Sequence, residues 1–247
     1  MLSQLIPLHL RFAPSRSWLG DSALWLGRPS NDAGPLIWPL LLSPERLNPS
    51  FRWPEGALQS YQRLTWRQTE VPDEVDVDLV LMGEKRARTS VLVAMETTAR
   101  AHGDILASVH SVSQVPDMAE ATVHEQEIAT PVAPDVPDGE ERFAFVISDH
   151  DVRGFADLME AEYAAHATTG GAWARGFPNI IAQGPTLLVA VARHLQLPTA
   201  GTLEMWFQHP IPVGALVSGM SSDGRRWKLT ISSRKRPAAT IVLSEPA

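Results

Sequence analysis

The stretch HATTGGAWARGFPNIIAQGPTLL, residues 166–188, runs from a histidine through a glycine-rich loop into an apolar segment. Gly184 followed by Pro185 is typical of a helix start, because proline has a helical φ and lacks an N–H that would be unpaired there. Apolar residues at helical spacing then indicate a buried helix within residues 180–195, namely Leu187, Leu188, Val191 and Leu195. The free amides of a first helical turn favour negative charge. The start of this helix and His166 are therefore a candidate site for a group on which negative charge develops.

Strand patterns surround this helix. FAFVIS (143–148) predicts a strand, and DHDVRGFADLMEAEYA (149–164) predicts an amphipathic helix capped by Ser148 or Asp149. After the buried helix, antiparallel strands are predicted at GTLEMWFQ (201–208), ALVSGMSS (215–222), RRWKLTISS (225–233) and AATIVLSE (238–245). A buried helix followed by such a meander predicts an α+β fold in which a sheet wraps around the helix.

A second meander is predicted in the first half of the chain, from EVDVDLVL (74–81), TSVLVAMETTAR (89–100) and ILASVHSVSQ (105–114). In the first sixty residues, only IWPLLLSPERL (37–47) indicates a short helix, which Pro39 interrupts. Residues 116–141 are rich in proline and acidic side chains and have no regular period, so they predict a linker. The expected units are residues 1–115 and 142–247, with the linker 116–141 between them.

Composition narrows the class of protein. The chain has 247 residues, 44% of them hydrophobic and 20% charged, which is typical of a soluble globular protein. The absence of cysteine excludes disulfides, thiolate nucleophiles and cysteine zinc sites, and favours the cytoplasm. A formal charge of −7 argues against nucleic-acid binding, and no segment is apolar enough to span a membrane. The histidines lack metal-ligand spacing and no nucleotide-binding motif occurs, so neither a metal nor a cofactor is expected.

Three segments together resemble a known family. MEAEYAAH (159–166), GFPNIIAQG (176–184) and FQHPIPVGA (207–215) are similar to the motifs of the MaoC-like, (R)-specific enoyl-CoA hydratase and acyl dehydratase branch of the hotdog superfamily. The resemblance covers residues 143–244. It implies a double hotdog, in which two sheets, each wrapped on a helix, join into one continuous sheet. The first half then resembles the degenerate N-terminal repeat of such proteins, and the chain is a monomeric pseudo-dimer or forms a homodimer.

The resemblance also implies a hydro-lyase that adds water to, or removes it from, an α,β-unsaturated acyl-CoA or acyl-carrier-protein thioester. The histidine of the family motif falls on His166, and the glycine whose amide binds the thioester oxygen falls on Gly184. The motif aspartate falls on Ala161, its asparagine on Tyr163, and the histidine before the glycine on Gln183. The missing aspartate predicts altered chemistry.

Nearby residues offer substitutes for that aspartate. Glu160 and Glu162 flank position 161, and on a continuous helix Glu162 lies one turn from His166, where it orients the imidazole and raises its pKa. The alternative is that both glutamates face water on a helix end. Tyr163 either supplies an acid or packs with its hydroxyl bonded. His166 itself is either a catalytic group or a hydrogen-bonded structural histidine.

Candidates for substrate binding are Gln183, Trp173 and the basic residues Arg225, Arg226 and Lys228. Trp173 either lines an acyl pocket or caps the core. The basic cluster suits the phosphates of coenzyme A or the acidic face of a carrier protein, unless it is only solvated. Two other functions stay open. One is a hotdog thioesterase with Glu160 or Glu162 as base, and the other is a non-catalytic acyl-binding or partner subunit.

Overall fold

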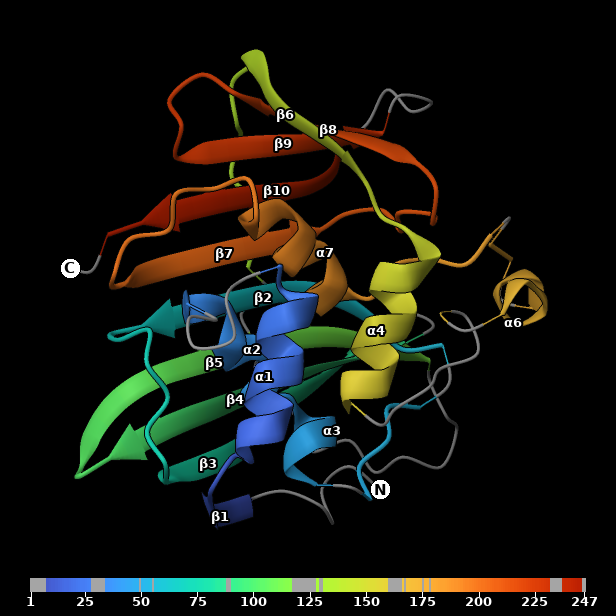
Figure 1. The fold of residues 1–247 in the computed structure, drawn as a ribbon. Helices are drawn as coiled ribbons and strands as arrows, with labels where there is room; N and C mark the ends of the chain where they lie inside the picture. The colour runs from blue at the N-terminus through green and yellow to red at the C-terminus, as the bar shows by residue number, and fades with distance from the viewer. Residues whose placement is uncertain are drawn as a thin grey trace.

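The structure, a computed structural model, describes residues 8–27, 34–48, 50–54, 56–87, 90–116, 128, 131–159, 166, 168–174, 176–177, 179–231 and 237–245. Its main feature is a ten-stranded antiparallel sheet with the strand order β1-β3-β4-β5-β2-β7-β10-β9-β8-β6 (Figure 1). The strands are β1 Leu8–Phe12, β2 Leu58–Trp66, β3 Val75–Ala87, β4 Ser90–Ala101, β5 Asp104–Pro116, β6 Glu140–Val146, β7 Gly201–Phe207, β8 Leu216–Ser221, β9 Arg226–Ile231 and β10 Pro237–Ser244.

The two halves of the chain meet where β2 pairs with β7, from Tyr61 opposite Trp206 to Trp66 opposite Gly201. Across this junction the Tyr61 hydroxyl donates to Glu204 Oε1 at 2.5 Å. Burial and the Glu204 carboxylate raise the pKa of Tyr61, so the donor stays protonated. Outward from the junction, five strands follow on each side, and the first strand of each half is the outermost one. The two halves of the sheet therefore have the same connectivity.

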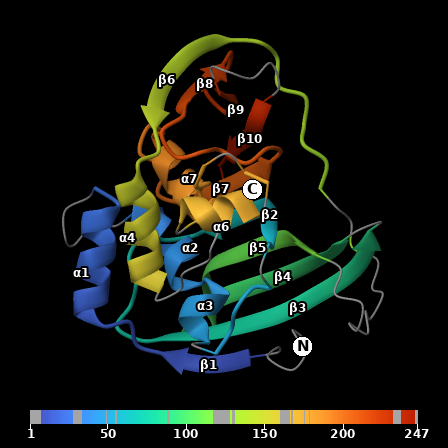
Figure 2. The ribbon, with the colours of Figure 1, turned by 90° about the vertical axis from the view of Figure 1, so that its right-hand side faces the viewer.

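Helices fill the inner face of the sheet. The segments are α1 Arg16–Trp25, the 3₁₀ helix η2 Gly34–Leu36, α2 Ile37–Leu41, α3 Pro44–Leu47, α4 Asp149–Met159, α6 Thr169–Ala174 and α7 Gly184–Ala192. Figure 2 shows α2 and α7 next to the sheet, with α1 and α4 farther out. Residues 36–42 and 186–192 are buried, and both segments belong to one hydrophobic core that spans the two halves. Among the described residues, no helix has the length and apolarity that crossing a membrane requires.

Most of the predicted strands are confirmed, because β4, β5 and β7 to β10 lie on the predicted segments. Three details were wrong. Pro39 does not interrupt a helix: it lies in the first turn of α2, where its missing N–H has no helical acceptor. The glycine-rich loop contains the short helix α6. The buried helix, by contrast, begins at Gly184 as its Gly-Pro pair predicts, and Ile181 before it forms a bridge with Pro212 in the loop that follows β7. Finally, β6 starts at Glu140, inside the predicted linker; its side chains are mostly exposed, which hides its strand pattern.

Candidate active site

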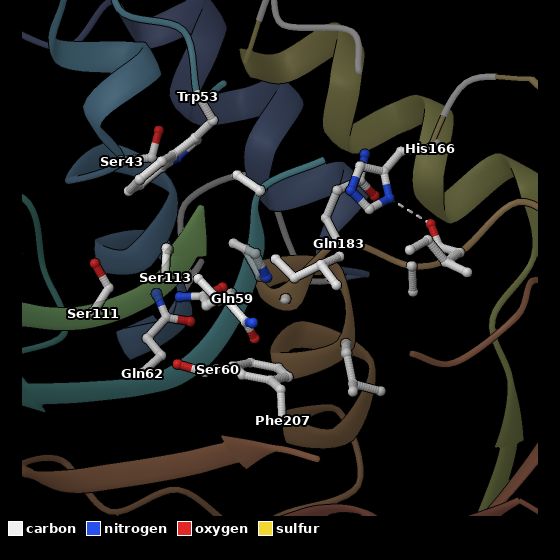
Figure 3. Close-up of a pocket in the computed structure, with 18 of the residues that line it drawn as sticks. Ser43, Trp53, Gln59, Ser60, Gln62, Ser111, Ser113, His166, Gln183 and Phe207 are labelled. Carbon is white, nitrogen blue, oxygen red and sulfur yellow. Dashed lines mark hydrogen bonds between the residues drawn. The ribbon is translucent and has the colours of Figure 1, made fainter. Parts of the chain in front are cut away.

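A cavity of about 250 Å³ lies between the start of α7 and the strands β2 and β5 of the other half of the chain. Figure 3 shows glutamine and serine side chains of β2 and β5 along one side of this cavity, with His166 and Gln183 on the other. Trp53 and Phe207 also line it. The cavity is therefore built jointly by the two halves of the chain.

Gly184 is the first residue of α7, after an extended N-cap residue, Gln183, and before Pro185. Within the described part of the chain, the Gly184 N–H donates no hydrogen bond. A Cβ at this position would overlap the side-chain amide of Gln59, so only glycine fits while Gln59 keeps its place. An unpaired amide at a helix start is suited to bind an oxygen on which negative charge develops.

His166 lines the same cavity. Its Nδ1 lies 2.6 Å from the carbonyl oxygen of Ile181. Since a carbonyl can only accept, Nδ1 is the protonated nitrogen and Nε2 keeps its lone pair. Burial lowers the pKa of His166, and the hydrogen bond to Ile181 offsets part of this effect. The imidazole is therefore neutral near pH 7 and able to accept a proton at Nε2.

The carbonyl that orients His166 is itself fixed by the loop after β7. The Ala182 N–H donates to the Ile211 carbonyl at 2.9 Å, and the Val213 N–H donates to the Ile180 carbonyl at 2.8 Å. These bonds join the segment 176–184 to the segment 207–215, two of the three segments on which the family resemblance rests. Thus β7, its loop and the start of α7 position the histidine and the glycine together.

The other predicted site residues have different outcomes. Gln183 is buried at the cavity; its Oε1 accepts from the Thr186 hydroxyl at 3.1 Å, and its Nε2 has no partner among the described residues. Glu160, Ala161, Glu162 and Tyr163 lie outside the described residues. Trp173 belongs to α6, but its side chain is not among those described. The roles predicted for these residues stay predictions.

The basic cluster does not line the cavity. Each of its members instead contacts an acidic side chain: Arg225 contacts Glu245 at 3.2 Å, Arg226 contacts Asp223 at 2.8 Å, and Lys228 contacts Asp138 at 3.0 Å. All six side chains lie at or near the surface, where such pairs add little stability. Binding of coenzyme A phosphates by this cluster stays a prediction, and it would have to compete with these contacts.

Several cavity residues were missed from the sequence. Glu45, on α3, is the one acidic side chain among the described residues that line the cavity. Gln59 and Gln62 on β2, and Ser111 and Ser113 on β5, form the wall opposite His166. The serines lay within a correctly predicted strand, but only the pairing of β5 with β2 places them at the cavity. Within the described residues, no cluster of histidine and acidic side chains is arranged to hold a metal ion.

No protein-family model and no curated protein matches this sequence. Solved structures do match. HtdX from Mycobacterium tuberculosis has a TM-score of 0.74 at 20% identity, covering 97% of this chain and 100% of that chain. A MaoC-like dehydratase from Phytophthora capsici has a TM-score of 0.69 at 13% identity, and each chain is covered completely. The peroxisomal multifunctional enzyme type 2 from Drosophila melanogaster has a TM-score of 0.69 at 14% identity, covering 96% of this chain and 48% of that chain. The chain has the fold of the MaoC-like dehydratases.

Within this MaoC-like fold, two residues carried over from the family motifs, His166 and Gly184, face the same cavity. The imidazole has an unprotonated nitrogen, and the glycine has an unpaired amide. The position that would carry the aspartate is Ala161. The MaoC-like cavity therefore contains a candidate base and a candidate oxyanion site, while the third group of the family motif is changed.

Proposed function

We propose that the protein is a MaoC-like hydratase or dehydratase that acts on an α,β-unsaturated or 3-hydroxyacyl thioester. The observation that carries this proposal is that His166 and the unpaired amide of Gly184 line one cavity at the junction of the two halves. Hydration of such a thioester needs these two functions. A base takes a proton from water as it attacks the β-carbon, and a hydrogen-bond donor stabilises the enolate oxygen.

In the proposed reaction, His166 Nε2 accepts the proton of the attacking water. The Ile181 carbonyl keeps Nδ1 protonated, so the imidazolium that forms has a bonding partner. The thioester oxygen accepts a hydrogen bond from the Gly184 N–H. This bond stabilises the negative charge that the oxygen gains as the water oxygen bonds to the β-carbon. Hydration is complete when the enolate takes a proton at its α-carbon. Dehydration is the reverse: the α-carbon loses that proton, and the imidazolium gives its own proton to the leaving hydroxyl.

A carboxylate must hold the attacking water in place of the family aspartate. A single hydrogen bond to His166 would not fix the direction from which the water approaches the β-carbon. Glu160 and Glu162 are the candidates that flank Ala161 in sequence. Glu45 is a third candidate, since it lines the cavity from α3. Tyr163 is the candidate acid.

The chain architecture fits a double hotdog with a degenerate first unit at residues 1–115, a linker near 116–141 and a second unit at 142–247. The matched strand order of the two halves and their direct β2–β7 pairing support this assignment. We expect a monomer that works as a pseudo-dimer, or a homodimer of such chains, in the cytoplasm. Its substrate is carried by coenzyme A or by an acyl carrier protein.

A second candidate function is favoured by Ala161. Loss of the aspartate is compatible with a subunit that binds an acyl thioester without turnover, or with a thioesterase that uses a glutamate as base. One assay separates the three functions. Crotonyl-CoA and crotonyl-pantetheine are followed for loss of the conjugated double bond, saturated acyl thioesters for release of free thiol, and both for binding by calorimetry.

Loss of the double bond supports the proposal, release of thiol supports the thioesterase, and binding alone supports the non-catalytic subunit. Glu45→Gln, Glu160→Gln and Glu162→Gln then identify the carboxylate, whose loss lowers the rate about 10²- to 10⁴-fold. Combining the responsible substitution with His166→Ala adds little, because the two groups act as a unit. A gain of hydration in Ala161→Asp indicates a hydratase site that has been redirected. If no glutamate matters and Ala161→Asp gains nothing, the catalytic proposal fails.

A further inference from the structure

The wall of the cavity opposite His166 is polar where a sheet interior is normally apolar. Five side chains of β2, β4 and β5 make up this polar wall: Gln59, Gln62, Thr97, Ser111 and Ser113. They project from the inner face of the sheet, on the same side as the buried residues Leu64, Trp66 and Met95. Polar residues at such positions need a reason, because burying an unpaired polar group destabilises a fold.

No partner in the described part of the chain accounts for these side chains. Within the described residues, none of the five makes a hydrogen bond through its side chain. Gln62, Thr97 and Ser113 are only 4%, 3% and 5% exposed, and Gln62 Oε1 is fully enclosed without a partner. Across the cavity, Gln183 Nε2 is likewise enclosed and unpaired. Buried polar groups in folded proteins are nearly always hydrogen-bonded, so both sides of the cavity require polar atoms between them.

Strand register joins the polar wall to the candidate catalytic groups. Gln59 lies opposite Ser113, and Gln62 lies opposite Ser111, so the four form two neighbouring cross-strand pairs of β2 and β5. The first pair, Gln59 and Ser113, lies next to Gly184, because the Gln59 amide packs against that glycine. The second pair, Gln62 and Ser111, is the next inward-facing pair along β2, farther from Gly184. A chain whose thioester oxygen binds the Gly184 amide therefore extends along the polar wall.

The size of the cavity limits what it holds. Its volume of about 250 Å³ is many times the roughly 10–15 Å³ that one water molecule needs in a cavity measured in this way. That is enough for a short acyl segment, and polar side chains lie within the same space. Serine and threonine hydroxyls and glutamine amides both donate and accept, which suits hydroxyl and keto groups rather than ions.

We infer that the acyl chain of the substrate carries a hydroxyl or keto oxygen beyond its β-carbon, which the polar wall binds. This inference rests on the proposed function, since it takes the thioester oxygen to bind at Gly184. Plain saturated chains are then poor ligands, because they leave Gln62 and its neighbours unpaired in the complex. Discrimination of this kind is strong, since a site that is built to hydrogen-bond a substrate group rejects an analogue without it.

Acyl-pantetheines test the inference, because they contain the part common to coenzyme A and carrier-protein thioesters. Calorimetry compares octanoyl-pantetheine with octanoyl-pantetheines that carry one hydroxyl or one keto oxygen at successive positions beyond the β-carbon. These chains have no α,β double bond and cannot be hydrated, and free-thiol detection reports any hydrolysis. We expect one oxygenated chain to bind about tenfold or more tightly than octanoyl-pantetheine.

Variants assign this preference to the polar wall. Gln62→Met has nearly the same shape without polar atoms, and Ser111→Ala with Ser113→Ala removes the partner hydroxyls; each should bring the affinity ratio toward one. Thr65→Val is the matched control. Thr65 lies on the opposite face of β2, bonded to Thr202 at 3.2 Å, so its loss leaves the preference intact. The ligand-free Gln62→Met protein should melt roughly 2–4 °C higher, because an unpaired buried amide is removed.

The outcomes are distinct. If all octanoyl chains bind equally well, or if the preference survives in both wall variants, the inference is overturned while the proposed function stands. A Gln62→Met protein that melts at a lower temperature also overturns it, because Gln62 would then be a structural residue. If no octanoyl-pantetheine binds while a crotonyl thioester is hydrated, the inference alone is overturned. If the crotonyl thioesters are not hydrated either, the proposed function fails, and the inference fails with it.

Discussion

The two halves of the sheet share a strand order but differ on the face that each turns toward the helices. In the C-terminal half, the inner positions Leu203, Met205, Leu229 and Ile241 are apolar and almost completely buried. In the N-terminal half, the corresponding region carries the polar wall. The contrast is sharpest at the junction, where Gln62 lies directly opposite Met205. Both halves pack against helices, and only the N-terminal half also has polar side chains on this face, next to the cavity.

The central helices differ in a related way. Gly-Pro introduces both: Gly34-Pro35 lies in η2, directly before α2, and Gly184-Pro185 opens α7. The first pair starts a buried 3₁₀ turn, and Gly34 has a positive φ of 59°. The second pair starts an α-helix directly, and Gly184 lines the cavity with an unpaired amide. The same two residues are therefore needed for backbone conformation in one half and for a close approach to the site in the other.

Glycine substitutions give the largest expected effect. Gly184→Val should abolish turnover or binding of acyl thioesters, because the side chain displaces Gln59 and covers the amide. Gly34→Ala should lower the free energy of unfolding by about 1 kcal/mol through backbone strain, and leave activity per folded molecule unchanged. Activity assays paired with melting curves for both variants check this. Full activity in a folded Gly184→Val protein excludes the oxyanion role.

Histidine substitutions give the next largest effect. His166→Ala should lower the rate about 10²- to 10⁴-fold, as expected for loss of a general base. His110 is the control: it is a partly buried histidine of β5 that lies beside Tyr61, at 6.0 Å between ring centroids, and does not line the cavity. His110→Ala should leave the rate unchanged. Equal losses in the two variants would mean that His166 acts only through stability.

Exchanging residues across the junction gives an intermediate effect on stability. Met205→Gln places an amide in a completely buried site that is apolar apart from Gln62 and should lower the free energy of unfolding by about 1–3 kcal/mol, whereas Gln62→Met should raise it. Chemical denaturation of both single variants measures the difference. If Met205→Gln is tolerated as well as Gln62→Met, the two faces do not differ as proposed.

The contrast between apolar and polar inner positions also explains which elements can be predicted from the sequence. In the C-terminal strands and helix α7, apolar residues recur at strand or helix spacing, and these residues are buried in the fold. These elements were therefore predicted nearly to their ends. Strand β2 was missed because its inner positions include Gln62 and its register shifts between Gln59 and Tyr61, which together remove the alternation. Helix α1, RSWLGDSALW, was missed because only three of its ten residues are buried. The residues that make the cavity polar are thus among those that conceal its strand.

The candidate site was predictable in part for a similar reason. His166 and Gly184 belong to local motifs, so their chemistry is readable from short stretches of sequence. The polar wall depends on the pairing of β2 with β5, strands whose paired residues are about 40 to 55 positions apart. No local pattern reports such a contact. Glu45 was missed because α3 is four residues long and reaches the cavity only through the packing of the N-terminal half.

The smallest expected effect is on the pH dependence of stability. Burial lowers the pKa of both His166 and His110; for His110, Arg63 adds to the effect and Glu96 opposes it. In the unfolded chain, both histidines titrate near their ordinary value of about 6.5. Between the lowered pKa and that value, the unfolded chain binds more protons than the folded protein. Stability is therefore full above about pH 6.5 and falls as the pH drops below it.

Melting temperatures measured from pH 7.5 down to about pH 5, above the range in which most carboxylates titrate, isolate this contribution. His166→Gln and His110→Gln should each flatten the decline, because glutamine takes up no proton in either state. The hydration rate separates the two sites. It should fall with decreasing pH in the wild type and in His110→Gln alike, since only protonation of His166 removes the base. A wild-type melting temperature that is constant over this range would mean that His166 is protonated as readily in the folded protein as in the unfolded chain, and it would contradict the assignment of a neutral base in the cavity.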